Sequence, residues 1–446
     1  MDNRKPLYNR LIGHNKLDRS SFHTPGHKCS DFLPENLIRL DYTELPDTDA
    51  LFEAESVILA LEKKLSLLYH TERSCLSAGG CTLAIQTMIR AAARCGGEIL
   101  CARNAHRSAV NAMALLGMDP IWIYPKGANN YTGRIIPDDV QSAFKEHPDI
   151  TACYITSPSY YGEISDIRRI AEICHNNKAI LLVDNAHGSH LAFMQENIHP
   201  INLGADMSAC SLHKTMPVMT GGAVLNIRTK ELSENAKSDM ALFGSTSPSY
   251  VIMSSVDLCA DYMLYGTGKE DYQQCEKTVA KLKKLSEKHG LMQPEGLCDP
   301  LRLTLNTAFV GLCGESNQTA YFESFGIDCE FCDGENAVLL CTPFNTERDF
   351  ERVRKAVEKL TAGQPVKKAA DRKAFPEKAM SIRDAVFSSA EIISVHDAVG
   401  RIAADTACPC PPGVPVIMPG EIIDAETAAV LSDYGFTAIK TVKTSK

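Results

Sequence analysis

Two spacings of hydrophobic residues alternate along the first half of the chain. Helical spacing, with apolar residues three and four positions apart, predicts helices at 51–69, 83–94, 108–116 and 167–176. Short runs that are apolar throughout predict strands at 98–101, 120–124, 152–156, 179–184, 207–212 and 223–227. Because such strands are buried on both faces, the pattern predicts a mostly parallel sheet covered by helices. The connection before 223–227 is short enough for this strand to run antiparallel to the others.

The other parts of the chain depart from this pattern and divide it into four predicted regions. Residues 1–50 are rich in Pro, His and Asp and lack periodicity, so we expect an extended arm. Helical spacing from Tyr250 to about Glu287 completes a large domain at 51–295. A smaller α+β domain is expected at 296–365, with strands near 301–305 and 337–341 and a helix at 347–360. The charged stretch 363–373 is a candidate linker to a last region at 374–446.

Composition narrows the expected partners of the protein. The 446 residues are 44% hydrophobic and 23% charged, which is ordinary for a globular protein. The formal net charge is −9 and the sequence has no basic stripe, so we do not expect nucleic acid as a partner. No apolar run approaches the ~18 residues that cross a bilayer, and segment 1–18 lacks the apolar core of a signal peptide. We therefore expect no membrane association.

The 17 cysteines are scattered through apolar runs, as at Cys153 and Cys174. We interpret them as buried free thiols and expect a cytoplasmic protein. Cys329 and Cys332 have the CxxC spacing of zinc ligands, but no second pair follows at a suitable spacing. We therefore expect no metal site and interpret this pair as strand cysteines that face the core.

Two ionisable residues follow successive predicted strands. Lys214 lies just beyond the strand at 207–212, where a side chain reaches the crevice in which α/β proteins bind ligands. An isolated loop lysine is more often an exposed surface residue. Asp184 ends the strand at 179–184, where a buried carboxylate requires a cation unless it merely caps the next helix. Their placement on neighbouring strands favours a shared site.

Two features upstream add to this pair. The turn Ser77-Ala78-Gly79-Gly80-Cys81-Thr82 opens a predicted helix, and free N–H groups at a helix start bind phosphate. His106 follows the strand at 98–101, where a neutral imidazole can stack on a flat ring. The alternatives are an ordinary turn and a loop histidine satisfied by its neighbours.

Together these candidates match the needs of pyridoxal 5'-phosphate (PLP). This cofactor needs a lysine amine to bond its aldehyde, a carboxylate at its pyridine nitrogen, a stacking group and a phosphate cradle. The sequence offers one candidate for each. We therefore predict a PLP-dependent enzyme in which Lys214 holds the cofactor as a Schiff base.

Further motifs in the same order resemble those of a known family. Ser-Phe-His-Thr-Pro-Gly-His-Lys at 21–28 and Asp-Tyr-Thr-Glu-Leu-Pro at 41–46 are similar to its opening motifs. Other matching segments lie at 103–108, 157–162, 184–188, 211–215, 245–250, 411–415 and 419–421. With these motifs the chain resembles the Orn/Lys/Arg decarboxylase family of fold-type I PLP enzymes. It looks most like the short bacterial arginine and lysine decarboxylases that lack an N-terminal wing domain.

The resemblance implies a fold and a role for each matching residue. The fold is an α/β, aspartate aminotransferase-like large domain that binds PLP, with a smaller α+β domain and a decarboxylase-type domain at 374–446. Lys214 bonds the cofactor, Asp184 pairs with its ring nitrogen, and His106 stacks on the ring. The turn that begins with Ser77 and Ala78 also contacts the cofactor, and its amides at Gly79, Gly80 and Cys81 bind the phosphate. The side chains of Ser211 and His213 add contacts to the phosphate, and His187 lies near the cofactor. Ser245 and Thr246 complete the phosphate site of a neighbouring subunit, which implies a homodimer with active sites at the interface.

The implied activity is the decarboxylation of arginine, lysine or ornithine, a carbon–carbon lyase reaction that feeds polyamine metabolism. The proton that returns to Cα comes from His213, Lys214 or a nearby hydroxyl. The cationic side chain of the substrate requires an acidic or carbonyl-lined pocket. Four carboxylates are candidates, each with the alternative of a solvated surface group: Asp47, Asp49, Glu330 and Glu421.

Two other interpretations stay open at this point. An aminotransferase or another lyase would use the same fold and the same lysine, and release of carbon dioxide from a basic amino acid separates it from a decarboxylase. An inactive, PLP-binding paralogue would also keep the fold. The presence of Lys214, Asp184 and His106 argues against the inactive paralogue.

Overall fold

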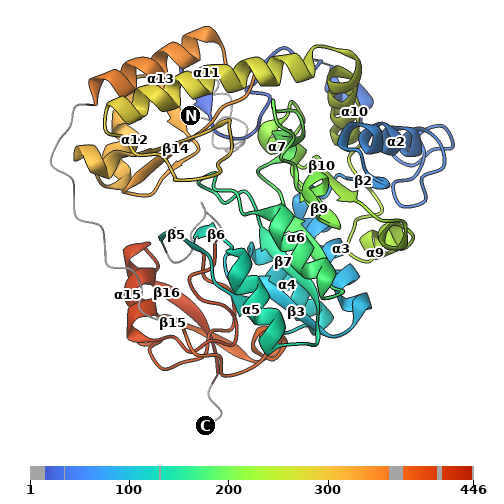
Figure 1. Ribbon diagram of the computed structural model, residues 1–446, viewed down its shortest axis with the longest axis vertical. Helices are drawn as coiled ribbons and strands as arrows, with labels where there is room; N and C mark the ends of the chain where they lie inside the picture. Colours follow the sequence, from blue (N-terminus) through green and yellow to red (C-terminus); the bar gives the residue numbers. More distant parts are fainter. Residues whose placement is uncertain (1–15, 35, 130–131, 361–374, 409–413, 444–446) are drawn as a thin grey trace, which may run out of the picture.

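A seven-stranded sheet organises the first two thirds of the chain. The computed structural model describes residues 16–34, 36–129, 132–360, 375–408 and 414–443 (Figure 1). In spatial order the strands are β2 (Arg73–Ser77), β10 (Ala223–Ile227), β9 (Met207–Cys210), β8 (Ile180–Asp184), β7 (Ile150–Thr156), β3 (Glu98–Ala102) and β4 (Ile121–Ile123). Neighbouring strands are parallel except β10, which runs antiparallel to β2 and β9. The predicted, mostly parallel sheet is confirmed, and 223–227 is its antiparallel strand.

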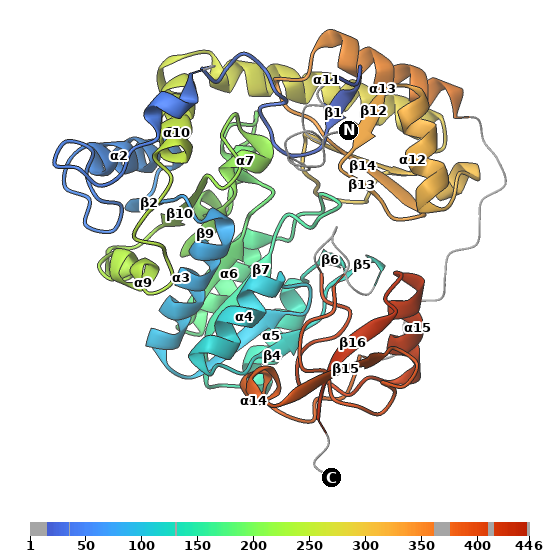
Figure 2. The ribbon, with the colours of Figure 1, turned by 180° about the vertical axis from the view of Figure 1, so that it is seen from behind.

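Helices cover both faces of this sheet (Figures 1 and 2). One face packs against α3 (Gly80–Cys95), α4 (Arg107–Leu116) and α9 (Ala236–Ala241), and the other against α5 (Pro137–Glu146) and α6 (Ile167–Asn176). Beyond the β2 edge lie α2 (Val57–Tyr69) and α10 (Tyr250–Tyr265). The short elements are η1 (Leu37–Leu40), β5 (Lys126–Asn129), β6 (Thr132–Arg134), η2 (Ser189–Ala192), η3 (Pro200–Leu203), α7 (Leu212–Thr215) and α8 (Lys230–Ser233). Packing on both faces explains why the central strands are apolar throughout.

Several boundaries differ from the predicted ones for local reasons. The helix predicted from residue 51 begins at Val57, because the carboxylate of Asp49 accepts the N–H groups of Ala50, Glu55, Ser56 and Ile58. The helical run after Tyr250 is two helices, α10 and α11 (Gly268–Lys288), that are separated at Gly266. The strand predicted at 207–212 stops at Cys210, and the one-turn helix α7 follows. Among the elements of the large domain, the sequence pattern did not predict the strand β2 or the helices α5, α8 and α9.

The small domain is built on a three-stranded antiparallel sheet with the order β11 (Arg302–Asn306), β14 (Asn336–Leu340) and β13 (Phe331–Cys332). It also contains η4 (Thr307–Val310), α12 (Glu315–Ser324), β12 (Ile327–Cys329) and α13 (Glu347–Lys359). The N-terminal segment joins it, because β1 (Ser20–Phe22) pairs in parallel with β12. Cys329 and Cys332 end two strands and are only partly buried. Within the described part of the chain, no group of three or more potential ligands is arranged to hold a metal.

The C-terminal domain, described from residue 375, contains α14 (Ile382–Phe387), β15 (Ala390–Ser394), α15 (Ala425–Asp433) and β16 (Ala438–Val442). Strands β15 and β16 pair antiparallel, and a separate apolar cluster that includes Ile417 and Leu431 forms its core. Helix α14 packs on α4, so this domain lies beside the β3–β4 edge of the central sheet (Figure 2). The predicted linker at 363–373 lies outside the described residues.

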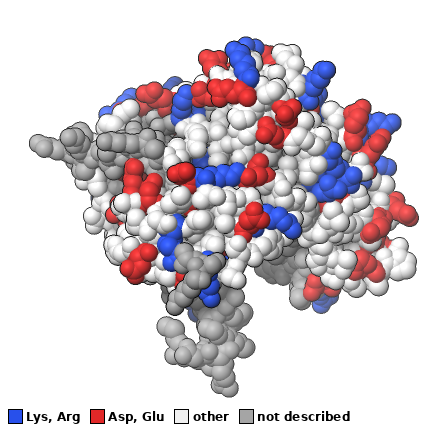
Figure 3. All heavy atoms as spheres, turned by 90° about the horizontal axis from the view of Figure 1, so that it is seen from below, with Lys and Arg blue, Asp and Glu red and all other residues white. Residues whose placement is uncertain are grey.

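Charged groups on the surface are mixed in sign. On the face shown in Figure 3, acidic and basic side chains are interspersed among uncharged ones. No helix among the described residues is long and apolar enough to cross a membrane.

Candidate active site

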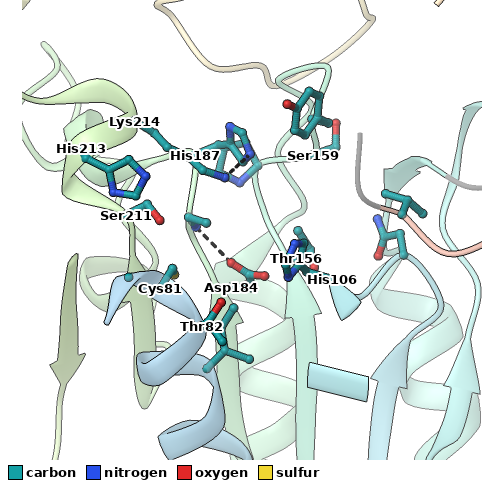
Figure 4. A pocket seen from close by; sticks show the side chains of 17 residues that line it. Cys81, Thr82, His106, Thr156, Ser159, Asp184, His187, Ser211, His213 and Lys214 are labelled. Atoms are coloured by element: carbon teal, nitrogen blue, oxygen red, sulfur yellow. Dashed lines mark hydrogen bonds between the residues drawn. The ribbon is translucent and has the colours of Figure 1, made fainter. Parts of the chain in front are cut away.

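A cavity of about 270 Å³ opens where the central parallel strands end. Thr156 and Asp184 are the last residues of β7 and β8, and Ser211 directly follows β9; all three line the cavity. Figure 4 shows these side chains converging on the same space. Because the carboxyl ends of parallel strands lie along one edge, residues distant in sequence meet here.

Lys214 reaches this cavity from α7, one turn beyond β9. Its Nζ lies 2.9 Å from Nε2 of His187, and both side chains line the cavity (Figure 4). Burial lowers the pKa of Lys214, and the carboxylates of Asp184 and Glu330 oppose that shift. Burial also holds the pKa of His187 well below its usual value, and the Lys214 charge adds to this effect. His187 is therefore neutral near pH 7, and its Nε2 accepts a hydrogen bond from Lys214.

Asp184 is a buried carboxylate that forms no salt bridge among the described residues, although its charge acts on Lys214 and His106. Its side chain is 2% exposed, Oδ1 accepts the N–H of Ala186 at 3.1 Å, and Oδ2 accepts the hydroxyl of Tyr154 at 3.2 Å. No helix begins at Asp184, so the alternative of a helix cap is wrong. An unpaired buried charge is costly, and a cationic ligand group in the cavity would relieve that cost.

The expected phosphate turn meets the cavity at its last residues. Gly80, Cys81 and Thr82 line the cavity, whereas Ser77, Ala78 and Gly79 do not. The N–H of Gly79 donates to Oγ of Ser77, and the N–H of Gly80 donates to the carbonyl of Gly221. Two of the three backbone amides expected to bind the phosphate, those of Gly79 and Gly80, therefore already donate to other groups of the protein. The amides of Cys81 and Thr82, in the first turn of α3, are better placed to bind an anion.

Two further histidines combine a structural contact with a place at the cavity. Nδ1 of His106 accepts the N–H of Ser108, so His106 caps α4, yet its ring also lines the cavity beside Thr156 (Figure 4). Burial lowers the pKa of His106, which favours the neutral ring expected of a stacking group. Burial lowers the pKa of His213 to about 4, and its Nδ1 donates to the carbonyl of Gly222 at 3.1 Å.

The predicted site is therefore largely brought together, except for Ser77, Ala78 and Gly79 of the turn and for Ser245 and Thr246. Among the predicted residues, Cys81, His106, Asp184, His187, Ser211, His213 and Lys214 line the cavity together with Gly80. Ser245 and Thr246 do not; both are exposed, and Thr246 borders a different cavity, with Phe52. Their proposed contribution to a second subunit stays a prediction.

Sequence reasoning missed several residues that line the cavity. They are Ile85, Asn104, Thr156, Pro158, Ser159, Tyr160, Ala186 and Val414. Most belong to segments that the motifs had marked, at 103–108, 157–162, 184–188 and 411–415, but no role had been given to them. The buried Oδ1 of Asn104 and Oγ1 of Thr156 have no hydrogen-bond partner among the described residues.

The four carboxylates considered as partners of the substrate side chain differ in whether they are free to bind a cation at the cavity. Asp49 is used to cap α2, and its four hydrogen bonds with backbone N–H groups hold its pKa at about 2 against the effect of burial. Glu421 is buried in an ion pair with Arg103. Asp47 is exposed and does not line the cavity. Asp49 and Glu421 are therefore wrong as free cation-binding groups.

Glu330 is the carboxylate that remains next to the cavity. Its Oε1 accepts the hydroxyl of Tyr160 at 2.9 Å, and its Oε2 accepts the N–H of Thr24 at 2.9 Å. Tyr160 itself lines the cavity and contacts the ring of His187 edge to face. No Lys or Arg in the described ranges forms an ion pair with Glu330. Glu330 thus joins the N-terminal segment and the small domain to the cavity wall.

The N-terminal segment also packs against the turn that contains Lys214. The N–H of Gly26 donates to the carbonyl of His213 at 2.8 Å, and Oγ1 of Thr342 donates to the carbonyl of Gly26 at 3.0 Å. A Cβ at position 26 would lie only 2.7 Å from the carbonyl oxygen of Met216. Only glycine permits this close packing on the turn that presents Lys214.

The arrangement fits pyridoxal 5'-phosphate. Lys214 supplies the amine, Asp184 a buried carboxylate that forms no salt bridge among the described residues, the start of α3 an anion site, and His106 a neutral ring. When bound, PLP supplies a cationic ring that accepts the electron pair released when a bond to the substrate Cα breaks. Asp184 would hold a proton at the ring nitrogen, and Ser211 and His213 would flank the phosphate beside Cys81 (Figure 4).

Comparison with known proteins gives a consistent result over most of the chain. Residues 5–307 match the family described as "Orn/Lys/Arg decarboxylase, major domain", and residues 364–443 match "Orn/Lys/Arg decarboxylase, C-terminal domain". The arginine decarboxylase of Bacillus subtilis (strain 168) is 29% identical, with 96% of this chain and 92% of that protein covered. The arginine decarboxylase of Bacillus anthracis is 28% identical, with 94% and 90% covered.

Solved structures share the fold. The lysine decarboxylase LdcF of Francisella novicida superposes with a TM-score of 0.75 at 17% identity, covering 99% of this chain and 82% of that one. At this identity the likeness concerns the fold alone. It agrees with the PLP fold-type I architecture expected from the sequence.

Proposed function

This chain belongs to the Orn/Lys/Arg decarboxylase family, and on that premise we propose that it converts arginine to agmatine and carbon dioxide. The class of reaction, PLP-dependent decarboxylation of a basic amino acid, follows from the family. The observation that carries it is one cavity that holds both the Lys214 amine and the buried Asp184 carboxylate. Arginine is favoured over lysine and ornithine because the two Bacillus relatives are both arginine decarboxylases.

Lys214 is our proposed proton carrier to the substrate Cα. A neutral His213 that donates its Nδ1–H to Gly222 keeps only a lone pair at Nε2, so it has no proton to give. The Lys214 amine carries protons in either charge state and lines the same cavity. Its lowered pKa eases proton release near neutral pH.

Glu330 is our proposed partner for the cationic side chain of the substrate. Each carboxylate oxygen can accept a second hydrogen bond beyond those from Tyr160 and Thr24. Its negative charge also acts on Lys214 and His213, which supports its proximity to the reacting groups. A planar guanidinium suits a carboxylate through paired N–H groups.

The decisive experiment supplies the purified protein with PLP and, separately, with arginine, lysine and ornithine. Agmatine with equimolar carbon dioxide from arginine is the expected product. Cadaverine or putrescine as the dominant amine would overturn the choice of arginine but keep the reaction class. When a keto acid is also added to accept the amino group, a new keto acid formed from the substrate without carbon dioxide would instead indicate transamination, and no product from any substrate would indicate an inactive protein.

A Glu330→Gln variant tests the side-chain partner. We expect kcat/KM for the preferred amino acid to fall about 10- to 100-fold, mainly through KM, because a charge-assisted contact of ~1.5–3 kcal/mol is lost. Glu335→Gln, which changes another carboxylate of the small domain, serves as the control and should leave KM unchanged. An unaltered KM in Glu330→Gln would exclude this role.

Three further proposals follow the family rather than a contact in this chain. We propose a homodimer in which Ser245 and Thr246 reach the phosphate of the neighbouring subunit. We also propose a cytoplasmic location, supported by free rather than disulfide-bonded cysteines in the described part of the chain. The amine product would enter polyamine synthesis.

A further inference from the structure

The C-terminal domain contributes a wall to the active-site cavity. Val414 lines the cavity together with Asn104 and His106, which lie at the other end of the sequence. The following segment, 415–421, is buried without interruption. The position of Val414 therefore depends on whatever holds this segment against the large domain.

Arg103 is the group that holds it. Its Nε and Nη2 donate to Oε1 and Oε2 of Glu421 at 3.2 and 2.8 Å, and its Nη1 donates to the carbonyl of Pro415 at 2.9 Å. Oε2 of Glu421 also accepts the N–H of Met418 at 2.8 Å. One guanidinium thus binds both ends of 415–421 directly behind Val414. Arg103 is also the residue before Asn104, so it couples two sides of the cavity.

The burial of this pair argues for positioning rather than simple attachment. The side chains of Arg103 and Glu421 are 1% and 4% exposed. A buried ion pair is often no more stabilising than apolar residues of the same size, but its bidentate geometry fixes one arrangement. Attachment has other sources, since Ile382 and Met418 of the C-terminal domain already pack into the apolar core of the large domain.

We propose that Arg103 and Glu421 position the C-terminal wall of the cavity, and that this wall retains the cofactor. The proposal rests on PLP occupying this cavity, as the proposed function requires, but not on which amino acid is decarboxylated. Val414 restricts the opening next to Asn104 and His106. PLP would leave as the free aldehyde after water hydrolyses its bond to Lys214, and displacement of 415–421 would widen the opening for that release.

The chain contains its own reporter for the test. Trp122 is the only tryptophan, and its ring centre lies 5.6 Å from Cζ of Arg103. Two measurements are compared between variants. The first is the tryptophan emission spectrum of the cofactor-free protein, and the second is the rate at which bound PLP is transferred to an excess of a PLP-requiring apoenzyme. Glu421→Gln keeps the size of the side chain and removes its charge. We expect altered Trp122 emission and at least about fivefold faster release of PLP, equivalent to ~1 kcal/mol.

Val414→Ala separates the wall from the pair that positions it. This variant keeps Arg103 and Glu421, so emission should be unchanged while PLP release is accelerated. Lys378→Met is the matched control, because it breaks an exposed ion pair with Asp119 between the same two domains and should alter neither measurement. A wild-type release rate in either Glu421→Gln or Val414→Ala would overturn the proposal. PLP release is measured without turnover. A protein that failed to decarboxylate arginine would therefore not, for that reason, show a wild-type release rate in these variants.

Discussion

Replacement of Lys214 by alanine is expected to abolish the visible absorbance of lysine-bound PLP and to slow turnover at least about 10³-fold. Lys214 is the one lysine that lines the cavity in the described part of the chain. The variant loses both the amine that bonds the cofactor and the proposed proton carrier to Cα. The absorbance spectrum of purified protein and the rate of carbon dioxide release measure these two losses separately.

Lys283 provides the control for this experiment. Burial lowers its pKa as it does that of Lys214, but its Nζ donates to the carbonyl of Asp299 and does not line the cavity. Lys283→Met should therefore keep the visible band. A Lys214→Ala protein that retained the band would show that another amine holds the cofactor, and the assignment of the site would fail.

The sequence predicted the parts of the site that depend on strand ends. Asp184 and Lys214 were found because continuous apolar strands mark the sheet and its carboxyl edge, where ligands bind. The antiparallel course of β10 was open to prediction because the connection before it is short. Such features are local, so the spacing of residues contains them.

Features that depend on contacts between distant segments could not be predicted in this way. Nothing local shows that Glu421 meets Arg103, or that Gly26 packs behind Lys214, because these contacts join opposite ends of the chain. The same is true of the Gly80 amide, which donates a hydrogen bond to the carbonyl of Gly221 in the connection between neighbouring strands. Asp49 was misjudged because an acidic residue before a helix has the same local pattern whether it caps the helix or binds a ligand.

Asp184→Asn is expected to leave PLP bound while turnover falls about 10²- to 10³-fold, the usual cost of losing one group that stabilises charge in the transition state. Asparagine keeps the volume and the hydrogen bond from Ala186, but it cannot balance a proton on the ring nitrogen. Lys214 and the start of α3 still hold the cofactor, so the visible band should persist. Comparison of the band with kcat for the preferred amino acid tests both statements.

Stability gives a second, independent measurement for this variant. In the cofactor-free protein Asp184 is buried and forms no salt bridge with any residue described, so removal of its charge should not lower the urea midpoint of unfolding. A purely structural aspartate would show the opposite, a loss of stability with little loss of turnover. Tyr154→Phe is a milder change at the same carboxylate, because it removes only the hydroxyl that donates to Oδ2. It should slow turnover about fivefold. A near-wild-type rate in Asp184→Asn would remove Asp184 from the chemistry, whatever the spectrum of the bound cofactor.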